Sequence, residues 1–139
     1  MAFDRIRGNS TSKIVVFDSS AILMLFEYSI SLEQELTKIL GSYEIVVPSK
    51  IVEELKFLCE KGKGKKKQYA KPALKLVEKY KIVADKSENA DNAVLNIAKK
   101  LNGIVFSNDK ELKKRAKKEK IKTIFMRNKK YLMISEDFV

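Results

Sequence analysis

Residues 90–126 read ADNAVLNIAKKLNGIVFSNDKELKKRAKKEKIKTIFM. Apolar residues recur at helical spacing over residues 90–101, and a short β-branched and aromatic run follows at 104–106. A second, highly charged helix is predicted for residues 108–119, ahead of a strand at 123–126. Alternation of this kind predicts an α/β fold, in which helices cover both faces of a mostly parallel sheet.

The rest of the chain extends the same alternation. Further strands are predicted at residues 14–17, 43–47, 82–83 and 131–134, and further helices at 19–28, 32–40, 49–60 and from after residue 67 to about residue 80. The predicted architecture is a three-layer α/β/α fold with a central, mostly parallel sheet of about five strands. Residues 1–12 lack apolar periodicity and are predicted to be a flexible tail, so that residues 13–139 form a single domain.

Histidine is absent and Cys59 is the only cysteine, which narrows the chemistry that the chain can perform. One cysteine cannot form an internal disulfide or a multi-cysteine zinc site, and its apolar neighbours predict a buried thiol. Without histidine there is no imidazole base, no imidazole metal ligand and no Ser-His or Cys-His pair. Any catalysis must therefore use carboxylates, lysines or a bound metal ion.

The formal net charge of +11 favours a polyanionic partner, because neutralising phosphates releases counterions. Nucleic acid is the expected partner, and the alternative is a lysine-rich surface that serves only solubility or heat tolerance. No apolar run approaches the length of a membrane-spanning helix, and the first residues carry charges where a signal peptide needs an apolar stretch. We expect a cytoplasmic protein without a membrane partner.

Residues 61–67 contain no apolar side chain and are predicted to be a flexible basic loop. Its lysines would line a path for the nucleic-acid backbone, and the alternative is a loop that is merely solvated. These lysines are Lys61, Lys63, Lys65, Lys66 and Lys67. Tyr69, beside the loop, is interpreted as a packing residue.

Two aspartates follow strands of the predicted sheet. Asp18 comes directly after the strand that ends at Phe17, and Asp109 lies three residues beyond Phe106. Ligands of open parallel sheets bind outside the carboxyl ends of the strands, so we expect both carboxylates at one edge of the sheet. The alternative for each of them is a helix cap.

Two further acids lie on apolar helix faces. Asp91 shares a face with Val94 and Leu95, and Glu54 falls among apolar residues whereas Glu53 does not. The alternatives are a first-turn acid favoured by the helix dipole for Asp91, and a pairing with a nearby lysine for Glu54. A site built from carboxylates alone suits hard cations, so the combination predicts Mg²⁺ or Mn²⁺.

Four short segments resemble the acidic motifs of the PIN domain, a nuclease family. DSS at residues 18–20 is similar to the first motif, an Asp after the first strand followed by small polar residues. IVEEL at 51–55 places Glu54 at the acidic position of the second, and ADNAV at 90–94 resembles the third. SND at 107–109 resembles the fourth, Thr-Asn-Asp, with serine in place of threonine.

The resemblance covers about residues 13–134, and residues 126–132 also look like the ending of stand-alone archaeal PIN proteins, which resemble both rRNA-processing and toxin nucleases. It implies a metal-dependent endoribonuclease that uses one or two Mg²⁺ or Mn²⁺ ions and is frequently a homodimer. The implied metal-binding and catalytic residues are Asp18, Glu54, Asp91 and Asp109, with Ser20 and Ser107 orienting the carboxylates.

Three alternatives to an RNA-processing enzyme stay open. The first is a catalytically silent PIN-like module that binds RNA or a partner protein through its basic surface. The second is a toxin ribonuclease that an antitoxin neutralises. The third is a nuclease directed at DNA, because metal chemistry hardly distinguishes the two sugars. The expected partners are accordingly RNA, a second copy of the chain, and an antitoxin or a ribosome-assembly factor.

Overall fold

Strands and helices alternate along residues 12–135, the part of the chain that the computed structural model describes. The strands are β1 (Lys13–Phe17), β2 (Tyr43–Pro48), β3 (Lys81–Val83), β4 (Ile104–Phe106), β5 (Thr123–Arg127) and β6 (Tyr131–Ile134). The helices are α2 (Ser19–Glu27), α3 (Leu32–Leu40), α4 (Ser49–Lys61), α5 (Gly64–Val77), α6 (Ala90–Leu101) and α7 (Lys110–Lys118). The α/β fold predicted from the alternation is confirmed.

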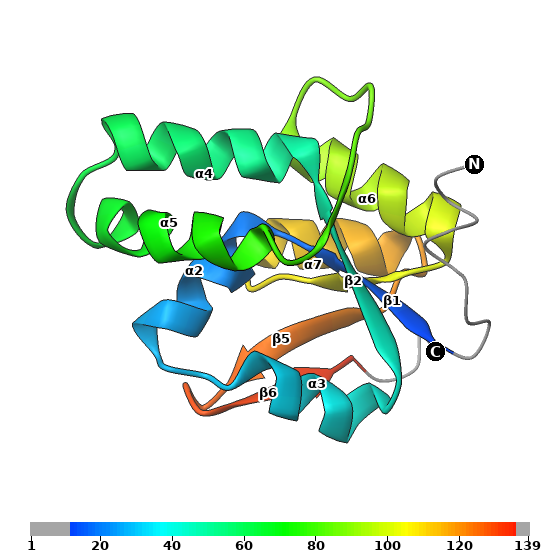
Figure 1. Cartoon of the computed structure of the whole chain (residues 1–139). Coiled ribbons are helices and arrows are strands. Elements are labelled where there is room, and N and C mark those ends of the chain that lie inside the picture. The colour runs from blue at the N-terminus through cyan, green and yellow to red at the C-terminus, as the bar shows by residue number, and fades with distance from the viewer. Residues whose placement is uncertain (1–11, 136–139) are drawn as a thin grey trace.

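The six strands form one sheet in the order β3-β2-β1-β4-β5-β6. All neighbouring pairs are parallel except β5 and β6, which run antiparallel. Each of the six predicted strand segments forms a strand of this sheet, which was expected to have about five strands, and β6 is the edge strand expected at its position. Helices α4 and α6 lie above the central strands β1 and β2 in Figure 1, and α3 lies on the opposite side, against β6, which gives the three layers.

Strand β1 occupies the centre of the sheet, because the chain moves to β2 on one side and returns to β4 on the other. Parallel sheets bind ligands where the strand order reverses in this way. Residues that follow β1 and β4 therefore meet at the edge where a site is expected.

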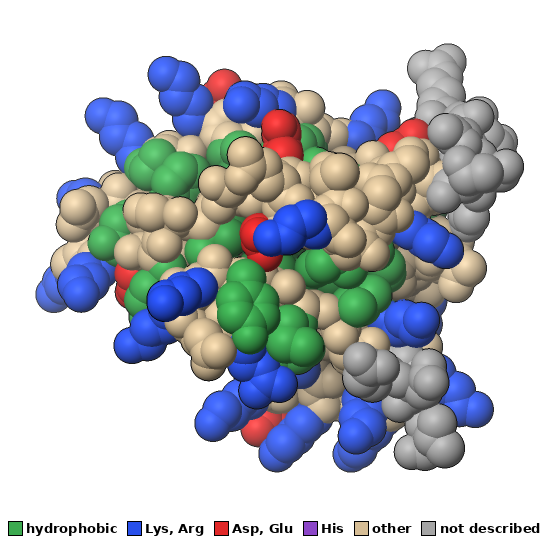
Figure 2. All heavy atoms as spheres, turned by 90° about the horizontal axis from the view of Figure 1, so that it is seen from below, with side chains coloured by type: hydrophobic (Ala, Val, Ile, Leu, Met, Phe, Trp, Pro, Cys, Tyr) green, Lys and Arg blue, Asp and Glu red, His purple; other side chains and the backbone are tan. Residues whose placement is uncertain are grey.

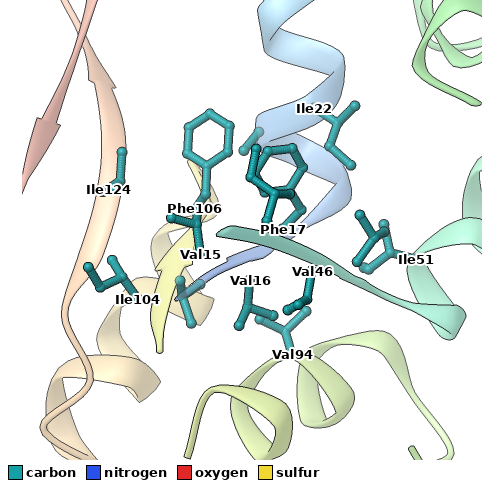
Figure 3. Packing of buried hydrophobic residues seen from close by; sticks show 14 of the residues in the cluster. Val15, Val16, Phe17, Ile22, Val46, Ile51, Val94, Ile104, Phe106 and Ile124 are labelled. Carbon is teal, nitrogen blue, oxygen red and sulfur yellow. The ribbon is translucent and has the colours of Figure 1, made fainter. Parts of the chain in front are cut away.

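The hydrophobic core surrounds the central strands on both faces (Figure 3). Val15, Val16 and Phe17 are completely buried, as an apolar strand covered by helices on both sides must be. The ring of Phe17 contacts that of Phe106 edge to face, with 5.2 Å between the ring centroids. This aromatic pair holds the ends of β1 and β4 together, directly below the first residues of the expected site.

The predicted flexible loop at residues 61–67 is wrong. Helix α4 continues through Lys61, only residues 62 and 63 lie between the helices, and α5 begins at Gly64. Lysine is a good helix former, so a lysine-rich stretch without apolar residues extends a helix as readily as it forms a loop. The basic residues lie on a hairpin of two packed helices, which projects to the left in Figure 1.

Smaller differences concern the chain ends and Cys59. The predicted tail, residues 1–12, lies outside the described residues except for Ser12, which is buried and pairs with the hydroxyl of Ser42 at 2.7 Å. Cys59 is half-buried rather than buried. Helix α5 ends at Val77 instead of near residue 80. None of the described helices is long and apolar enough to cross a membrane.

Candidate active site

Asp18 lies at the carboxyl end of β1 and is almost completely buried, with 4% of its surface exposed. Its backbone N–H donates to the carbonyl oxygen of Phe106 at 3.0 Å. The carboxylate oxygen Oδ2 accepts hydrogen bonds from Ser20 at 2.5 Å and from Ser107 at 2.8 Å. No residue between 12 and 135 donates to the other oxygen, Oδ1. The two serines therefore orient the carboxylate and leave Oδ1 without a hydrogen-bond donor among the described residues.

Residues 107–109 form a rigid turn after β4. Ser107 is fully buried, and its hydroxyl accepts the backbone N–H of Asp109 at 3.0 Å. The side-chain oxygen of Asn108 accepts the N–H of Met126 at 2.8 Å, which fixes the turn against β5. Asp109 caps α7, because its Oδ1 accepts N–H groups of the first turn at 2.8 and 3.2 Å. The cap reading is thus correct for Asp109, and its Oδ2 has no donor within the described chain.

Glu54 faces the start of α2. The hydroxyl of Ser19 donates to its Oε2 at 2.5 Å, so this contact joins α4 to the residue after Asp18. Lys50 instead pairs with Glu53 at 3.9 Å, where the Glu53 side chain is 64% exposed. The alternative of a Glu54–lysine pair is therefore wrong, and the apolar spacing separated the two adjacent glutamates correctly.

Asp91 lies in the first turn of α6, where Asn89 provides the helix cap. Burial raises the pKa of the Asp91 carboxyl, and the nearby carboxylate of Asp109 raises it further, while Arg115 lowers it. Arg115 is held beside this turn by a hydrogen bond of 2.6 Å to the side-chain oxygen of Asn92. A first-turn acid next to a second carboxylate is less favourable than a dipole-stabilised acid on an open surface.

The same electrostatic effects connect the four acids. The pKa of Asp18 is raised chiefly by burial, the hydroxyls of Ser20 and Ser107 lower it, and the charges of Glu54 and Asp91 raise it again. Because Asp91 in turn interacts with Asp109, the four carboxylates form one repelling group at the carboxyl edge of the sheet. They come from four separate parts of the chain, which the fold brings together.

The five predicted nucleic-acid-binding lysines do not lie together around the acids. Lys61 ends α4, Lys63 lies between the helices, and Lys65, Lys66 and Lys67 belong to the first turn of α5. Of these, Lys65 and Lys66 line a cavity that also contains Ser20. The other three line none of the described cavities near the acids.

Ser19, Asn108 and Asn92 were not among the predicted site residues. Ser19 and Asn92 directly follow the acids Asp18 and Asp91, and Asn108 precedes Asp109. A small polar residue beside an acid at a helix start or strand end is the signal that could have indicated them. Their hydrogen bonds hold Glu54, Arg115 and strand β5 in place around the acids.

The acids fit a hard cation by their chemistry, although their side chains do not enclose one. Within residues 12–135, no group of three acidic or cysteine side chains is arranged to hold a metal ion. The donors are nevertheless all oxygens, and Asp18, Asp91 and Asp109 each keep an oxygen that accepts no hydrogen bond from the described residues. Repulsion among these carboxylates is the condition that a divalent cation relieves.

The sequence matches known proteins over most of its length. Residues 15–129 match a family described as PIN like domain. The chain is 37% identical over 124 residues to Ribonuclease VapC4 of Methanocaldococcus jannaschii, which covers 86% of this chain and 95% of that protein. It is 28% identical over 134 residues to Ribonuclease VapC9 of Archaeoglobus fulgidus, covering 96% and 97% of the two chains.

Solved structures show the same fold at low sequence identity. The PIN domain endonuclease Utp24 superposes with a TM-score of 0.74 at 19% identity, over 90% of this chain and 92% of that one. A domain of a functionally unknown protein from Methanocaldococcus jannaschii superposes with a TM-score of 0.58, also at 19% identity, over 84% and 92%. Fold and sequence thus agree with the resemblance first seen in four short acidic motifs, and the chain belongs to the PIN-like domain family.

Proposed function

We propose that this protein is a metal-dependent endoribonuclease that hydrolyses RNA phosphodiester bonds at Asp18, Glu54, Asp91 and Asp109. The observation that carries the proposal is the buried carboxylate of Asp18, held by two hydroxyls at the end of the central strand and facing other acids. Two relatives that cover most of the chain carry the name ribonuclease, which supports RNA as the substrate.

Three aspartates would hold one or two Mg²⁺ or Mn²⁺ ions through their open oxygens, with Glu54 binding directly or through a water. When bound, the ion lowers the pKa of a coordinated water and stabilises negative charge on the phosphate oxygens. Ser20 and Ser107 keep the Asp18 carboxylate in one orientation, and Ser19 does the same for Glu54.

The remaining groups of the site would position the substrate. The chain has no histidine to activate a serine hydroxyl, and Cys59 is not among the site residues, so the carboxylates would orient an attacking water and no covalent nucleophile would be used. Arg115, beside Asp91, is a cation that can contact a phosphate oxygen. Antitoxin, ribosome-assembly and second-copy partners stay predictions, as do the ion and its number.

Cleavage of a labelled single-stranded RNA tests this proposal. Wild type and Asp18→Asn are compared in Mn²⁺, in Mg²⁺ and in EDTA, beside a DNA of the same sequence. We expect cleavage of RNA that requires metal and disappears in the variant. Metal-independent cleavage, or full activity of Asp18→Asn, would overturn the site. RNA binding without cleavage in either metal would instead favour the silent binding module.

A further inference from the structure

A small cavity of about 220 Å³ lies between α2 and α5, beside the acidic site. Helix α2 contributes Ser20 and three later residues, while the first two turns of α5 contribute two lysines and an aromatic ring. The lining residues are Ser20, Leu23, Met24, Glu27, Lys65, Lys66 and Tyr69. The cavity is smaller than the roughly 300–1,000 Å³ of pockets for drug-sized ligands, so it suits one flat group rather than a whole small molecule.

Ser20 connects this cavity to the acids. Its hydroxyl donates to Asp18 at 2.5 Å and accepts the backbone N–H of Asn108 at 3.2 Å. Ser20 therefore belongs both to the acidic site and to the lining of the cavity. An RNA strand with a phosphodiester bond at Asp18 would place an adjacent nucleotide over Ser20 and into the cavity. The cavity is therefore within reach of the same substrate.

The side chains of the cavity match the two parts of a nucleotide. Tyr69, Leu23 and Met24 provide an aromatic ring and apolar walls on which a base can stack. Lys65 and Lys66 stand one turn before Tyr69 on α5, at positions i−4 and i−3, so their charges lie on its face of the helix. Neither lysine forms an ion pair with any acid of residues 12–135, and both remain available to a phosphate.

The carboxylate of Glu27 makes the two ends of the cavity electrostatically different. It is exposed on the last turn of α2, two turns beyond Ser20, and its negative charge repels a phosphate at that end. The phosphate is thus favoured at the lysines and disfavoured at Glu27. Charge alone would not locate such a path, because Lys and Arg side chains project along most of the described outline of the face in Figure 2.

We propose that this cavity is a nucleotide subsite of the nuclease, in which a base next to the cleaved bond stacks on Tyr69 and its phosphate binds Lys65 and Lys66. The proposal rests on the ribonuclease function proposed above. It assigns Tyr69 to substrate binding instead of packing alone, and it separates two lysines from the other basic residues of the helical hairpin.

Binding is measured in the Asp18→Asn background, so that the result does not depend on cleavage. The probe is a short fluorescent single-stranded RNA, followed by anisotropy at several salt concentrations. We expect Tyr69→Ala to weaken binding by about 5- to 150-fold, as loss of one base–aromatic stack does, and Tyr69→Phe to bind within about twofold. Thermal melts of each variant establish that it is folded.

A matched pair of double variants tests the lysines. Lys65→Ala with Lys66→Ala removes two charges from the cavity, whereas Lys71→Ala with Lys75→Ala removes two exposed charges from the same helix. We expect the Lys65 and Lys66 double variant to bind more weakly and its negative slope of log K against log salt to become shallower by about 2. The Lys71 and Lys75 double variant should change neither quantity appreciably. The two variants have equal net charge, so long-range attraction cannot explain a difference.

Two results would overturn the subsite. One is equal binding by Tyr69→Ala and Tyr69→Phe together with equal effects of the two lysine pairs. The other is a lack of any RNA binding by the Asp18→Asn protein at low salt. Cleavage by the wild type is measured separately, so a nuclease with normal metal-dependent cleavage but no role for Tyr69 would disprove the subsite and leave the proposed function intact.

Discussion

The hydroxyl of Ser107 donates a hydrogen bond of 2.8 Å to the carboxylate of Asp18, although the two residues are 89 positions apart in the chain. The same hydroxyl accepts the backbone N–H of Asp109 at 3.0 Å. One buried side chain therefore fixes two of the proposed metal-binding residues relative to each other. No other described hydroxyl bridges two of the four acids in this way.

Removing the hydroxyl should damage activity and stability together. Ser107→Ala leaves the N–H of Asp109 without its acceptor, which we expect to lower the free energy of unfolding by about 1–3 kcal/mol. Activity should fall about 10- to 100-fold, as for other residues that orient metal-binding carboxylates. Urea unfolding and RNA cleavage measure the two effects. Ser107→Thr keeps the hydroxyl and serves as the control, and equal activity of both variants would contradict the role of Ser107.

Asp18→Asn should stabilise the metal-free protein at neutral pH while it abolishes cleavage. Burial raises the pKa of Asp18 above its ordinary value of 3.8, so the folded state binds the proton more tightly than the unfolded state. Stability of the wild type therefore falls as pH rises through the folded pKa, and the charge costs stability at pH 7. Asparagine removes that cost and still accepts hydrogen bonds from Ser20 and Ser107.

The measurement is Tm in EDTA as a function of pH. We expect Asp18→Asn to melt a few degrees higher at pH 7, since about 1 kcal/mol shifts Tm by roughly 2–8 °C in domains of this size range. The difference should shrink toward pH 3, where the wild-type carboxyl is protonated in both states. A lower Tm of the variant at pH 7 would show that the hydrogen bonds of the carboxylate outweigh its burial.

Adjacent glutamates of α4 should differ sharply in function. The Glu54 carboxylate accepts a hydrogen bond from Ser19, and its charge acts on Asp18. Glu54→Gln removes that charge, so we expect the rate of cleavage to fall about tenfold or more. Glu53→Gln changes an exposed pair with Lys50 that is worth about 0–1 kcal/mol, and should cleave RNA normally. Steady-state cleavage rates at saturating metal compare them, and equal losses in both variants would exclude a special role of Glu54.

The strands were predicted correctly, and the four acids stood out as candidates whose metal-binding role stays a prediction, because both features depend on local patterns. Completely buried strands such as β1 and β4 must be apolar throughout, and an acid on an apolar helix face is rare enough to stand out. The hairpin of α4 and α5 was predicted with too long a loop, again for a local reason. Its connection has no Ser, Thr, Asp or Asn to cap α5, and Lys63 occupies the cap position without a side-chain hydrogen bond.

Contacts between distant residues could not be predicted from spacing. The Ser19–Glu54 and Asn92–Arg115 hydrogen bonds join residues 35 and 23 positions apart, and both depend on how helices pack on the sheet. Tyr69 was interpreted as a packing residue because one aromatic beside a basic stretch has no distinctive pattern. Only the packing of α5 on α2 places its ring beside Ser20.

Glu35 should stabilise the edge of the sheet in a pH-dependent way. Its Oε1 accepts the backbone N–H of Leu132 on the edge strand β6 at 2.9 Å, and its Oε2 accepts from Lys38 at 3.0 Å. These contacts, the Leu132 N–H foremost, lower the pKa of Glu35 below its ordinary value of 4.5. The contribution of Glu35 to stability is therefore present above pH 4.5 and is lost as pH falls through the folded pKa.

Glu35→Ala should lower the free energy of unfolding by about 1–3 kcal/mol at pH 7, because an edge-strand N–H loses a charged acceptor. Glu35→Gln keeps an acceptor without the charge and should fall between the wild type and the alanine variant. Urea unfolding at pH 7 and at pH 3 separates the two contributions, since the advantage of the wild type over Glu35→Gln should shrink at the lower pH. A constant difference between these two proteins at both pH values would mean that the charge of Glu35 contributes nothing, and that only its shape holds α3 against β6.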